Sequence, residues 1–242
     1  MNTNRLPSGT ACHYIGGREG LAEALRRFTS APLQIIDLVG SFAPTLPQVT
    51  AAASASRESV IISTRRNNLN DELGHAESSL LAAVPNSIIL RCAPLDLSIP
   101  LLWAWAQATG ILMSAFHTQG VAWIRTVDLA EAISRMTAAD IGTRRGEVYD
   151  VTGPDCVSMA QLRDLMADQL GEDIQLSCLP PDVFAEKLLA NGMPDDVARW
   201  VAEYQNTSSS PELPPTTSVL SALLGRTPST AQLIPHDYQD RK

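Results

Sequence analysis

Residues 59–95 read SVIISTRRNNLNDELGHAESSLLAAVPNSIILRCAPL, and this stretch decides the fold. It contains two runs of mostly branched apolar residues, SVIIST (59–64) and SIILRC (87–92). Neither run alternates apolar with polar residues, which is typical of parallel strands that are buried on both faces. The segment between them, DELGHAESSLLAAV (71–84), has the length and composition of a helix. A strand, a helix and a second strand in this order predict an α/β protein with a parallel sheet.

The alternation of strand and helix continues on both sides of this unit. Further strands are predicted at 10–15, 33–41, 147–153 and 174–179, and further helices at 20–28, 47–57, 126–138, 158–171, 181–192, 194–205 and 218–225. Ser158 is suited to cap the start of one helix, and Gly171 to end it. The pattern predicts a doubly wound, mostly parallel sheet in residues 1–145. A small C-terminal α/β subdomain is predicted in residues 146–242, within the same compact unit.

Charge and cysteine content exclude several classes of function. The 242 residues carry a formal charge of -8 and no basic cluster, which argues against nucleic acid and against an anionic membrane as partners. Arginine pairs at 26–27, 65–66 and 144–145 are predicted to be solvated surface. The four cysteines lie far apart without a CxxC motif, so we expect neither a metal site nor a disulfide framework. The N-terminus lacks the apolar segment of a signal peptide, and we expect a cytoplasmic protein.

Residues 97–116, LSIPLLWAWAQATGILMSAF, carry no charge over about the length of a membrane span. Pro100, Gln107 and Gly110 interrupt this segment, and no basic residues flank it as anchors. We therefore expect a buried segment that lines a pocket. A membrane span and an exposed oligomer contact are the alternatives.

Four segments carry a resemblance to a known family: HAESSLLAAVPNSIILRCAPL (75–95), WIRTVDLAEAI (123–133), GEVYDVTGPDCVSMAQL (146–162) and SVLSALLGRTPSTAQLI (218–234). In their order and spacing they resemble the NmrA-like branch of the atypical short-chain dehydrogenase/reductase family. The resemblance implies a Rossmann-like sheet, reduced here in its N-terminal half.

A member of that family would begin with a strand, a glycine-rich loop and a helix that hold a dinucleotide pyrophosphate. Only 58 residues precede SVIIST, so roughly two strand–helix units are missing. IGGREG (15–20) is either the glycine-rich loop, with later units deleted, or the turn of the third unit. We favour the third unit, because Ile15 replaces the first glycine of G-x-G-x-x-G and Glu19 would repel a phosphate. In both cases IGGREG is predicted to be only a turn.

The resemblance also locates the residues that a reductase of this superfamily would use. The positions of its catalytic tyrosine and lysine, counted back from Glu77, fall on Leu69 and Leu73, which cannot transfer a proton. YQDRK (238–242) matches Tyr-x-x-x-Lys by chance at the end of the sequence, and Lys187 is the one other lysine. We therefore expect no nicotinamide cofactor and no hydride transfer.

Six residues remain as candidates for a site beyond the carboxyl ends of the strands. Asp96 and His117 are candidate acid/base groups, and Thr64 a candidate substrate-orienting hydroxyl. Ser63, Trp103 and Trp105 are candidate substrate-binding residues. The structural alternatives are an N-cap of the next segment for Asp96, a helix cap or turn for Ser63 and Thr64, a surface loop for His117, and the core for both tryptophans. His75 is a weaker candidate, and Arg91 is expected to pair with an acidic group.

These observations predict a cofactor-independent, NmrA-like protein that binds a small hydrophobic metabolite. It would catalyse a redox-neutral step, such as cyclisation, isomerisation or dehydration, in secondary metabolism. A ligand-sensing regulator or protein-binding subunit is one alternative, and an NAD(P)H-dependent reductase with an unusual nucleotide site is the other. Loss of two strands would expose a sheet edge, which is covered either by the N-terminal segment or by a second copy in a homodimer, and we expect a homodimer.

Overall fold

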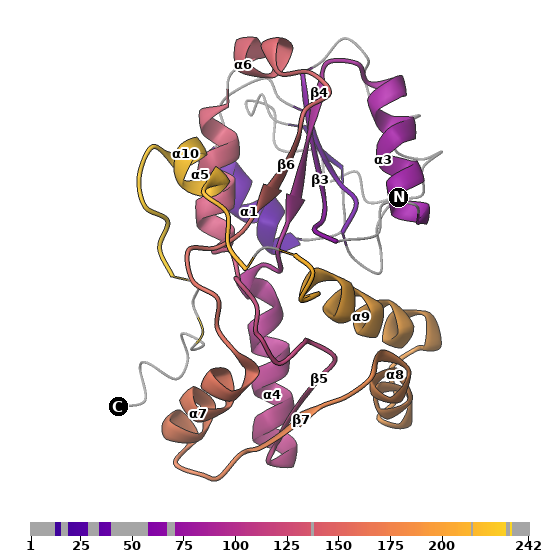
Figure 1. Cartoon of the computed structure of the whole chain (residues 1–242), viewed down its shortest axis with the longest axis vertical. Coiled ribbons are helices and arrows are strands. Elements are labelled where there is room, and N and C mark those ends of the chain that lie inside the picture. The colour runs from indigo at the N-terminus through magenta and orange to yellow at the C-terminus, as the bar shows by residue number, and fades with distance from the viewer. Residues whose placement is uncertain are drawn as a thin grey trace.

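A computed structural model of the chain describes residues 13–15, 19–28, 34–39, 58–66, 71–136, 138–213, 215–230 and 233. These residues form an upper part, built on a five-stranded sheet, and a lower part of helices around a two-stranded sheet (Figure 1). The predicted helix at 47–57 and the tail after residue 235 lie outside the described residues.

The main sheet is entirely parallel, and its strands stand in the order β1-β2-β3-β4-β6. The strands are β1 (His13–Ile15), β2 (Gln34–Asp37), β3 (Ser59–Thr64), β4 (Ser87–Cys92) and β6 (Val148–Val151). All six residues of β3 are buried, because helices cover both faces of the sheet. The strands predicted at 59–64 and 87–92 are confirmed at both ends, and the α/β fold class is confirmed with them.

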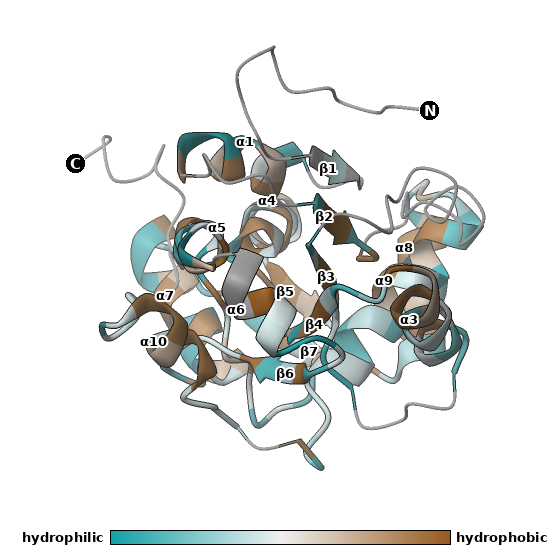
Figure 2. Ribbon diagram, turned by 90° about the horizontal axis from the view of Figure 1, so that it is seen from above, coloured by the Kyte–Doolittle hydropathy of each residue, from teal (hydrophilic) through white to brown (hydrophobic). Residues whose placement is uncertain are grey.

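Alternate residues of each strand face different helices. On one face, Val60 and Ile62 pack with α1 (Glu19–Phe28) and α5 (Thr126–Arg135). On the other face, Ile61 packs with α3 (Glu72–Ala83). Figure 2 shows the strands of the main sheet in a row from β1 at the top to β6 at the bottom. α5 and α10 (Val219–Leu224) lie on one side of this row and α3 on the other.

The N-terminal unit β1–α1 stands at the edge of this sheet. β1 pairs with β2, with Tyr14 opposite Ile35, so β1 is an edge strand of the described sheet. In the Rossmann order 3-2-1-4-5-6, the first strand lies beside the fourth. The third strand is separated from the fourth by two other strands. β1 therefore occupies the place of the first unit, and the assignment to the third unit that we favoured from the sequence is wrong for its position in space. The homodimer stays a prediction.

The crossovers through α1 and α3 have opposite hands. β1 to β2 and β3 to β4 advance in the same direction across the sheet, yet α1 and α3 lie on opposite faces. About 98% of such parallel crossovers are right-handed. One of the two therefore has the rare hand. This is the arrangement that remains when the units between a first and a fourth Rossmann strand are removed.

The lower part is assembled from segments on both sides of β6. Its elements are a short 3-10 turn, η1 (Asp96–Ser98), α4 (Ile99–Thr109), β5 (Ile111–Ser114), α7 (Met159–Leu170), β7 (Gln175–Cys178), α8 (Pro181–Ala190) and α9 (Asp195–Ser208). Because β6 follows residue 145 and pairs with β4, the main sheet includes strands from both predicted units, 1–145 and 146–242. Ser158 and Gln161 form a capping box at the start of α7, and Gly171 ends this helix with a φ of 69°, as predicted.

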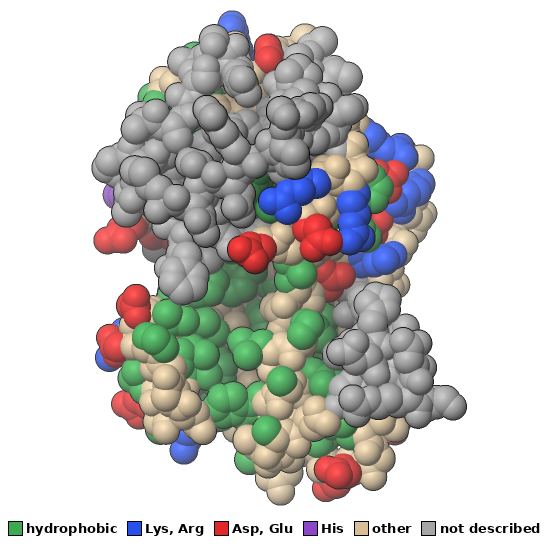
Figure 3. All heavy atoms as spheres, turned by 180° about the vertical axis from the view of Figure 1, so that it is seen from behind, with side chains coloured by type: hydrophobic (Ala, Val, Ile, Leu, Met, Phe, Trp, Pro, Cys, Tyr) green, Lys and Arg blue, Asp and Glu red, His purple; other side chains and the backbone are tan. Residues whose placement is uncertain are grey.

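The uncharged segment 97–116 contains the whole of α4 and β5. Trp103 is buried in a core with β5 and α7, whereas Leu101 is 54% exposed. Seen from behind, apolar side chains gather over the lower part and charged ones are more frequent above (Figure 3). No described helix is both long and apolar enough to cross a membrane. The helix predicted at 126–138 ends earlier, at Arg135, and the separate helix α6 (Ala138–Thr143) follows it.

Candidate functional site

The carboxyl end of β3 places two consecutive arginines at the edge where parallel sheets bind ligands. Arg65 and Arg66 follow β3 directly and are only 3% and 5% exposed. The prediction that this pair is solvated surface is wrong, whereas the described pairs at 26–27 and 144–145 are exposed. The place of Arg65 and Arg66 in the sequence could have shown this, because residues that directly follow a buried parallel strand lie at the ligand-binding edge of the sheet.

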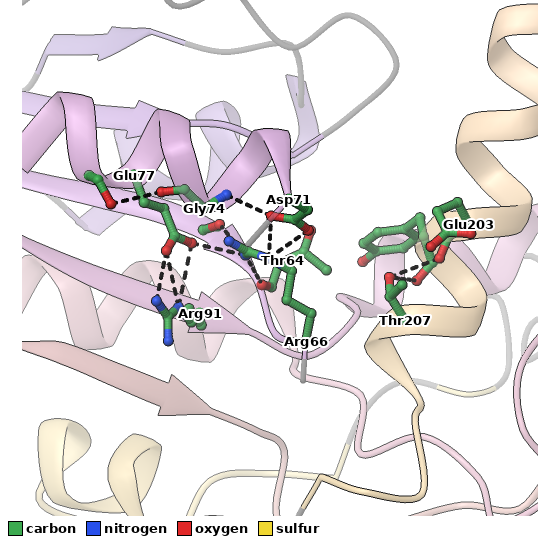
Figure 4. A network of polar contacts seen from close by, with 11 residues as sticks. Thr64, Arg66, Asp71, Gly74, Glu77, Arg91, Glu203 and Thr207 are labelled. Carbon is green, nitrogen blue, oxygen red and sulfur yellow. Dashed lines mark hydrogen bonds and ion pairs between the residues drawn. The ribbon is translucent and has the colours of Figure 1, made fainter. Parts of the chain in front are cut away.

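Arg66 belongs to a buried ion network with Glu77 and Arg91 (Figure 4). One guanidinium nitrogen of Arg66, Nη1, donates to Glu77 Oε1 at 2.9 Å, and Arg91 Nη2 donates to Glu77 Oε2 at 2.8 Å. Asp71, the N-cap of α3, pairs with Arg66 Nε at 3.1 Å. The network fastens α3 to the ends of β3 and β4, and the predicted acidic partner of Arg91 is Glu77.

Ser63 and Thr64 contribute to the same network. Arg66 Nη1 donates to the Ser63 hydroxyl at 3.2 Å and to the Thr64 carbonyl at 2.8 Å. Burial alone would raise the pKa of Glu77, but hydrogen bonds from Arg91, Ser63 and Arg66 together outweigh it, and the pKa lies below its ordinary value of 4.5. The Ser63 hydroxyl therefore stabilises the fold here.

A pocket of about 210 Å³ lies between the upper and lower parts, and we call it the sheet-end pocket. It opens at the ends of β3 and β4 and extends to the end of α9. Its described lining residues are Arg65, Ala93, Gln119, Gly120, Val121, Ala122, Cys156, Ser208, Ser209, Ser210, Pro211, Leu213 and Pro215. The walls are largely apolar, and three serines and one arginine are among the described lining residues.

Arg65 gives the sheet-end pocket its charge. Its side chain is 4% exposed, and its Nε lies 3.5 Å from Oδ2 of Asp150, whose side chain is 37% exposed. Burial lowers the pKa of Arg65, and the attraction of Asp150 opposes this. Burial also raises the pKa of the neighbouring Cys156 thiol, which favours the neutral form.

Asp96 lies at the junction of the two parts, where it holds the start of α5. Its Oδ1 accepts hydrogen bonds from the Thr126 backbone N–H at 3.0 Å and from the Thr126 hydroxyl at 2.6 Å. The alternative predicted from the sequence, a cap of the segment that follows Asp96, differs from this, because the donors belong to Thr126, the first residue of α5.

Asp96→Ala is therefore expected to cost about 1 kcal/mol of unfolding free energy, because an orphaned helix N–H loses its acceptor. Urea unfolding of this variant measures the loss. The control is Asp164→Ala, since the Asp164 side chain is 64% exposed and should contribute little. Equal stability of both variants would contradict the structural role and return Asp96 to the candidates for proton transfer.

The other predicted site residues are dispersed. The backbone N–H of His117 donates to the Ser209 hydroxyl at 3.0 Å, which places His117 beside the pocket but not among its described lining residues. Trp103 is 2% exposed in the core, and Trp105 packs half-buried against a second core around α8 and α9. His75 is exposed on α3. No residue of 97–116 is among the described residues that line the sheet-end pocket.

The place of a dinucleotide pyrophosphate, the N-terminal turn of α1, is in contact with an apolar side chain. A β-carbon added to Gly20 would lie 2.8 Å from Cδ2 of Leu97, so Leu97 packs directly on this turn. Two carboxylates lie in the same unit. Glu19 begins α1, and Asp37, at the end of β2, accepts a hydrogen bond from the Tyr14 hydroxyl at 2.7 Å.

Comparison with known proteins identifies the fold. No family model and no curated protein sequence matches the chain. Among solved structures, an NADPH-dependent quinone oxidoreductase from Escherichia coli superposes with a TM-score of 0.69 at 19% identity, over 94% of this chain and 89% of that one. The triphenylmethane reductase of a Citrobacter species gives 0.61 at 14% identity, over 90% and 80%.

NmrA, a negative transcriptional regulator, gives a TM-score of 0.50 at 12% identity, over 86% of this chain and 70% of that one. Reductases and a regulator therefore share the Rossmann-like fold of this chain.

Proposed function

We propose that the protein binds a small, largely apolar metabolite in the sheet-end pocket, without a dinucleotide, and acts as a ligand sensor. The observation that carries this proposal is the combination of a formed pocket at the ends of β3 and β4 with Leu97 packed on the N-terminal turn of α1. The pocket lies where a Rossmann-like enzyme would bind its substrate. The turn that would bind the nucleotide pyrophosphate is instead in contact with Leu97.

Three features argue against a bound dinucleotide. The strand order runs in one direction, so the described sheet lacks the reversal point at which Rossmann folds hold a dinucleotide. Leu97 contacts the turn whose backbone N–H groups would face the pyrophosphate. The carboxylate of Glu19, the first residue of α1, would repel its phosphates.

The described lining of the sheet-end pocket favours binding over catalysis. Its titratable side chains are Arg65 and Cys156, and burial works against the charged form of each. Leu73, at the lysine position of a reductase, packs on the core beneath α3. A ligand-sensing role fits these groups, and NmrA shows that a regulator can have this fold.

The first test is calorimetric titration of the purified protein with NADPH and NADH. We expect no binding up to millimolar cofactor, with the E. coli quinone oxidoreductase as positive control. In parallel, mass spectrometry identifies any small molecule released on denaturation. Micromolar binding of either cofactor would contradict the proposal.

Two variants of Cys156 locate the ligand. Cys156→Phe adds a ring to the pocket wall and should abolish retention of the released compound, whereas Cys156→Ser preserves the space and should retain it. Circular dichroism checks that both are folded. Equal retention by folded Cys156→Phe would place the ligand elsewhere.

A further inference from the structure

The net charge of the chain is concentrated in one segment. Residues 159–213 contain ten acidic and three basic side chains, whereas residues 1–158 contain fourteen acidic and twelve basic ones. The first difference is -7, and the formal charge of the whole chain is -8. The segment that forms α7, β7, α8 and α9 is therefore strongly acidic, while the rest of the chain is nearly neutral.

A groove with a volume of about 420 Å³ lies between two helices of this segment, and we call it the α8–α9 groove. Figure 1 shows α8 and α9 side by side at the margin of the lower part. The described residues that line the groove are Pro181, Asp182 and Ala185 from α8 and Arg199, Ala202 and Glu203 from α9. Ala185 and Ala202 are buried in the core between the two helices, whereas the three charged residues are exposed. The groove therefore combines an apolar floor with charged walls.

The charged side chains of the groove are not equally free to bind a partner. Arg199 Nε lies 3.0 and 3.1 Å from the two carboxylate oxygens of Asp195, so its charge is balanced within α9. The carboxylates of Asp182 and Glu203 have no hydrogen bond or ion pair with any residue that the structure describes. The groove thus offers one unpaired negative charge from each helix.

We propose that the α8–α9 groove docks a partner protein through a short basic segment, in which lysine or arginine side chains flank an apolar residue. The basic side chains pair with Asp182 and Glu203, which steers and orients the segment. The apolar residue covers Ala185 and Ala202 and removes the floor of the groove from water.

Charge complementarity selects this occupant over others. Two copies that met through their α8–α9 grooves would place two acidic segments face to face, and like charges across an interface lower affinity. A nucleic acid or an anionic membrane would be repelled in the same way. A basic segment is instead attracted by the whole acidic segment, within about a Debye length of its surface.

α9 connects the α8–α9 groove to the sheet-end pocket. Glu203 lines the groove, and Ser208, the last residue of the same helix, lines the pocket. Five residues separate them, which is about 7.5 Å along the helix axis. This placement fits a sensor whose output is a protein contact. Docking goes beyond the proposed function, however, and does not depend on a ligand in the pocket.

Peptide selection tests the inference on the full chain. A displayed library of random peptides is selected for binding to the wild-type protein, and fluorescence anisotropy measures the affinity of the selected peptides. We expect these peptides to carry at least two lysine or arginine residues beside an apolar one. Asp182→Asn combined with Glu203→Gln should weaken their binding about three- to tenfold, the contribution of two exposed ion pairs. Glu172→Gln, at an exposed carboxylate outside the described groove lining, is the control and should leave binding nearly unchanged.

Charge reversal gives a test that loss of folding cannot imitate. Asp182→Lys combined with Glu203→Lys should reject the selected peptides. The same variant should bind versions of them in which glutamate replaces each lysine and arginine. Both side chains are exposed, so the variant should remain folded, and circular dichroism checks this.

Several outcomes would overturn the docking proposal. It fails if selection yields no peptide, if the selected peptides have no excess of basic residues, or if they bind the neutral variant as tightly as wild type. It also fails if wild type sediments as a dimer that charge reversal dissociates, because the groove would then join two copies. None of these results bears on the calorimetric titration that tests the sheet-end pocket, so the two proposals fail separately.

Discussion

Glu77→Gln is expected to lower the free energy of unfolding by about 3 to 5 kcal/mol, the cost of breaking a buried ion pair from one side. The Glu77 side chain is 3% exposed, and it is the common acceptor for Arg66 and Arg91. Without its charge, Arg66 keeps Asp71 alone as an ionic partner while its side chain is 2% exposed. Urea unfolding monitored by circular dichroism measures the loss.

Glu23→Gln is the matched control. Glu23 pairs with Arg27 on α1, but both side chains are more than 60% exposed, so the variant should lose less than about 0.5 kcal/mol. Similar losses in the two variants would show that the network beneath α3 contributes no more than a surface pair.

The contribution of Glu77 should also depend on pH in a fixed direction. Because its pKa is lower in the folded protein than the ordinary 4.5, its ionised form stabilises the fold above that value, and the contribution is lost as the pH falls through the folded pKa. The difference in stability between wild type and Glu77→Gln should therefore be constant near neutral pH and shrink below about pH 4.5. A difference that grows in acid would have the wrong sign.

Gly153→Ala is expected to destabilise the protein by about 3 kcal/mol or more. A β-carbon at Gly153 would lie 1.9 Å from the Trp123 carbonyl oxygen, which is backbone and cannot rotate away. The Gly153 N–H also donates to the Ala122 carbonyl at 2.9 Å, so the clash would separate two bonded segments. Trp123 is 1% exposed and packs edge-on to Phe116, so its displacement would disturb the lower core.

Gly142→Ala tests whether this cost comes from contact rather than from the type of substitution. Nothing lies within 4 Å of a β-carbon at Gly142, which is exposed in α6. The change should stabilise the protein by about 0.5 to 1 kcal/mol, since alanine favours a helix. Thermal unfolding of both variants compares them. A mild effect of Gly153→Ala would mean that the Trp123 backbone yields readily.

Local chemistry made much of the fold predictable. Unbroken apolar runs at 59–64 and 87–92 mark β3 and β4, because buried parallel strands tolerate few polar side chains. The Ser158 and Gly171 signals mark both ends of α7, because each satisfies backbone groups within one turn. The position of β1 could not be found in this way, since pairing with β2 depends on which strands are missing between them.

The site was harder to predict, because its residues meet only in the folded chain. Arg65 and Ser209 are separated by most of the sequence yet line one pocket. Asp96 was chosen because it is a charge entering an apolar segment, but the structure directs its Oδ1 to Thr126. A carboxylate at such a junction satisfies the first N–H group of a helix, and that role leaves no trace in the sequence near Asp96 itself.

The one-directional strand order has a consequence for synthesis. β2, β3 and β4 each pair with the described strand that precedes them in the chain, from His13 opposite Gln34 to Ser59 opposite Ser87. In a Rossmann sheet, the fourth strand must instead return past two others to reach the first. Here each strand of the main sheet from β2 to β4 pairs with the described strand made just before it, so this part of the sheet can grow in the order of translation by closing short loops.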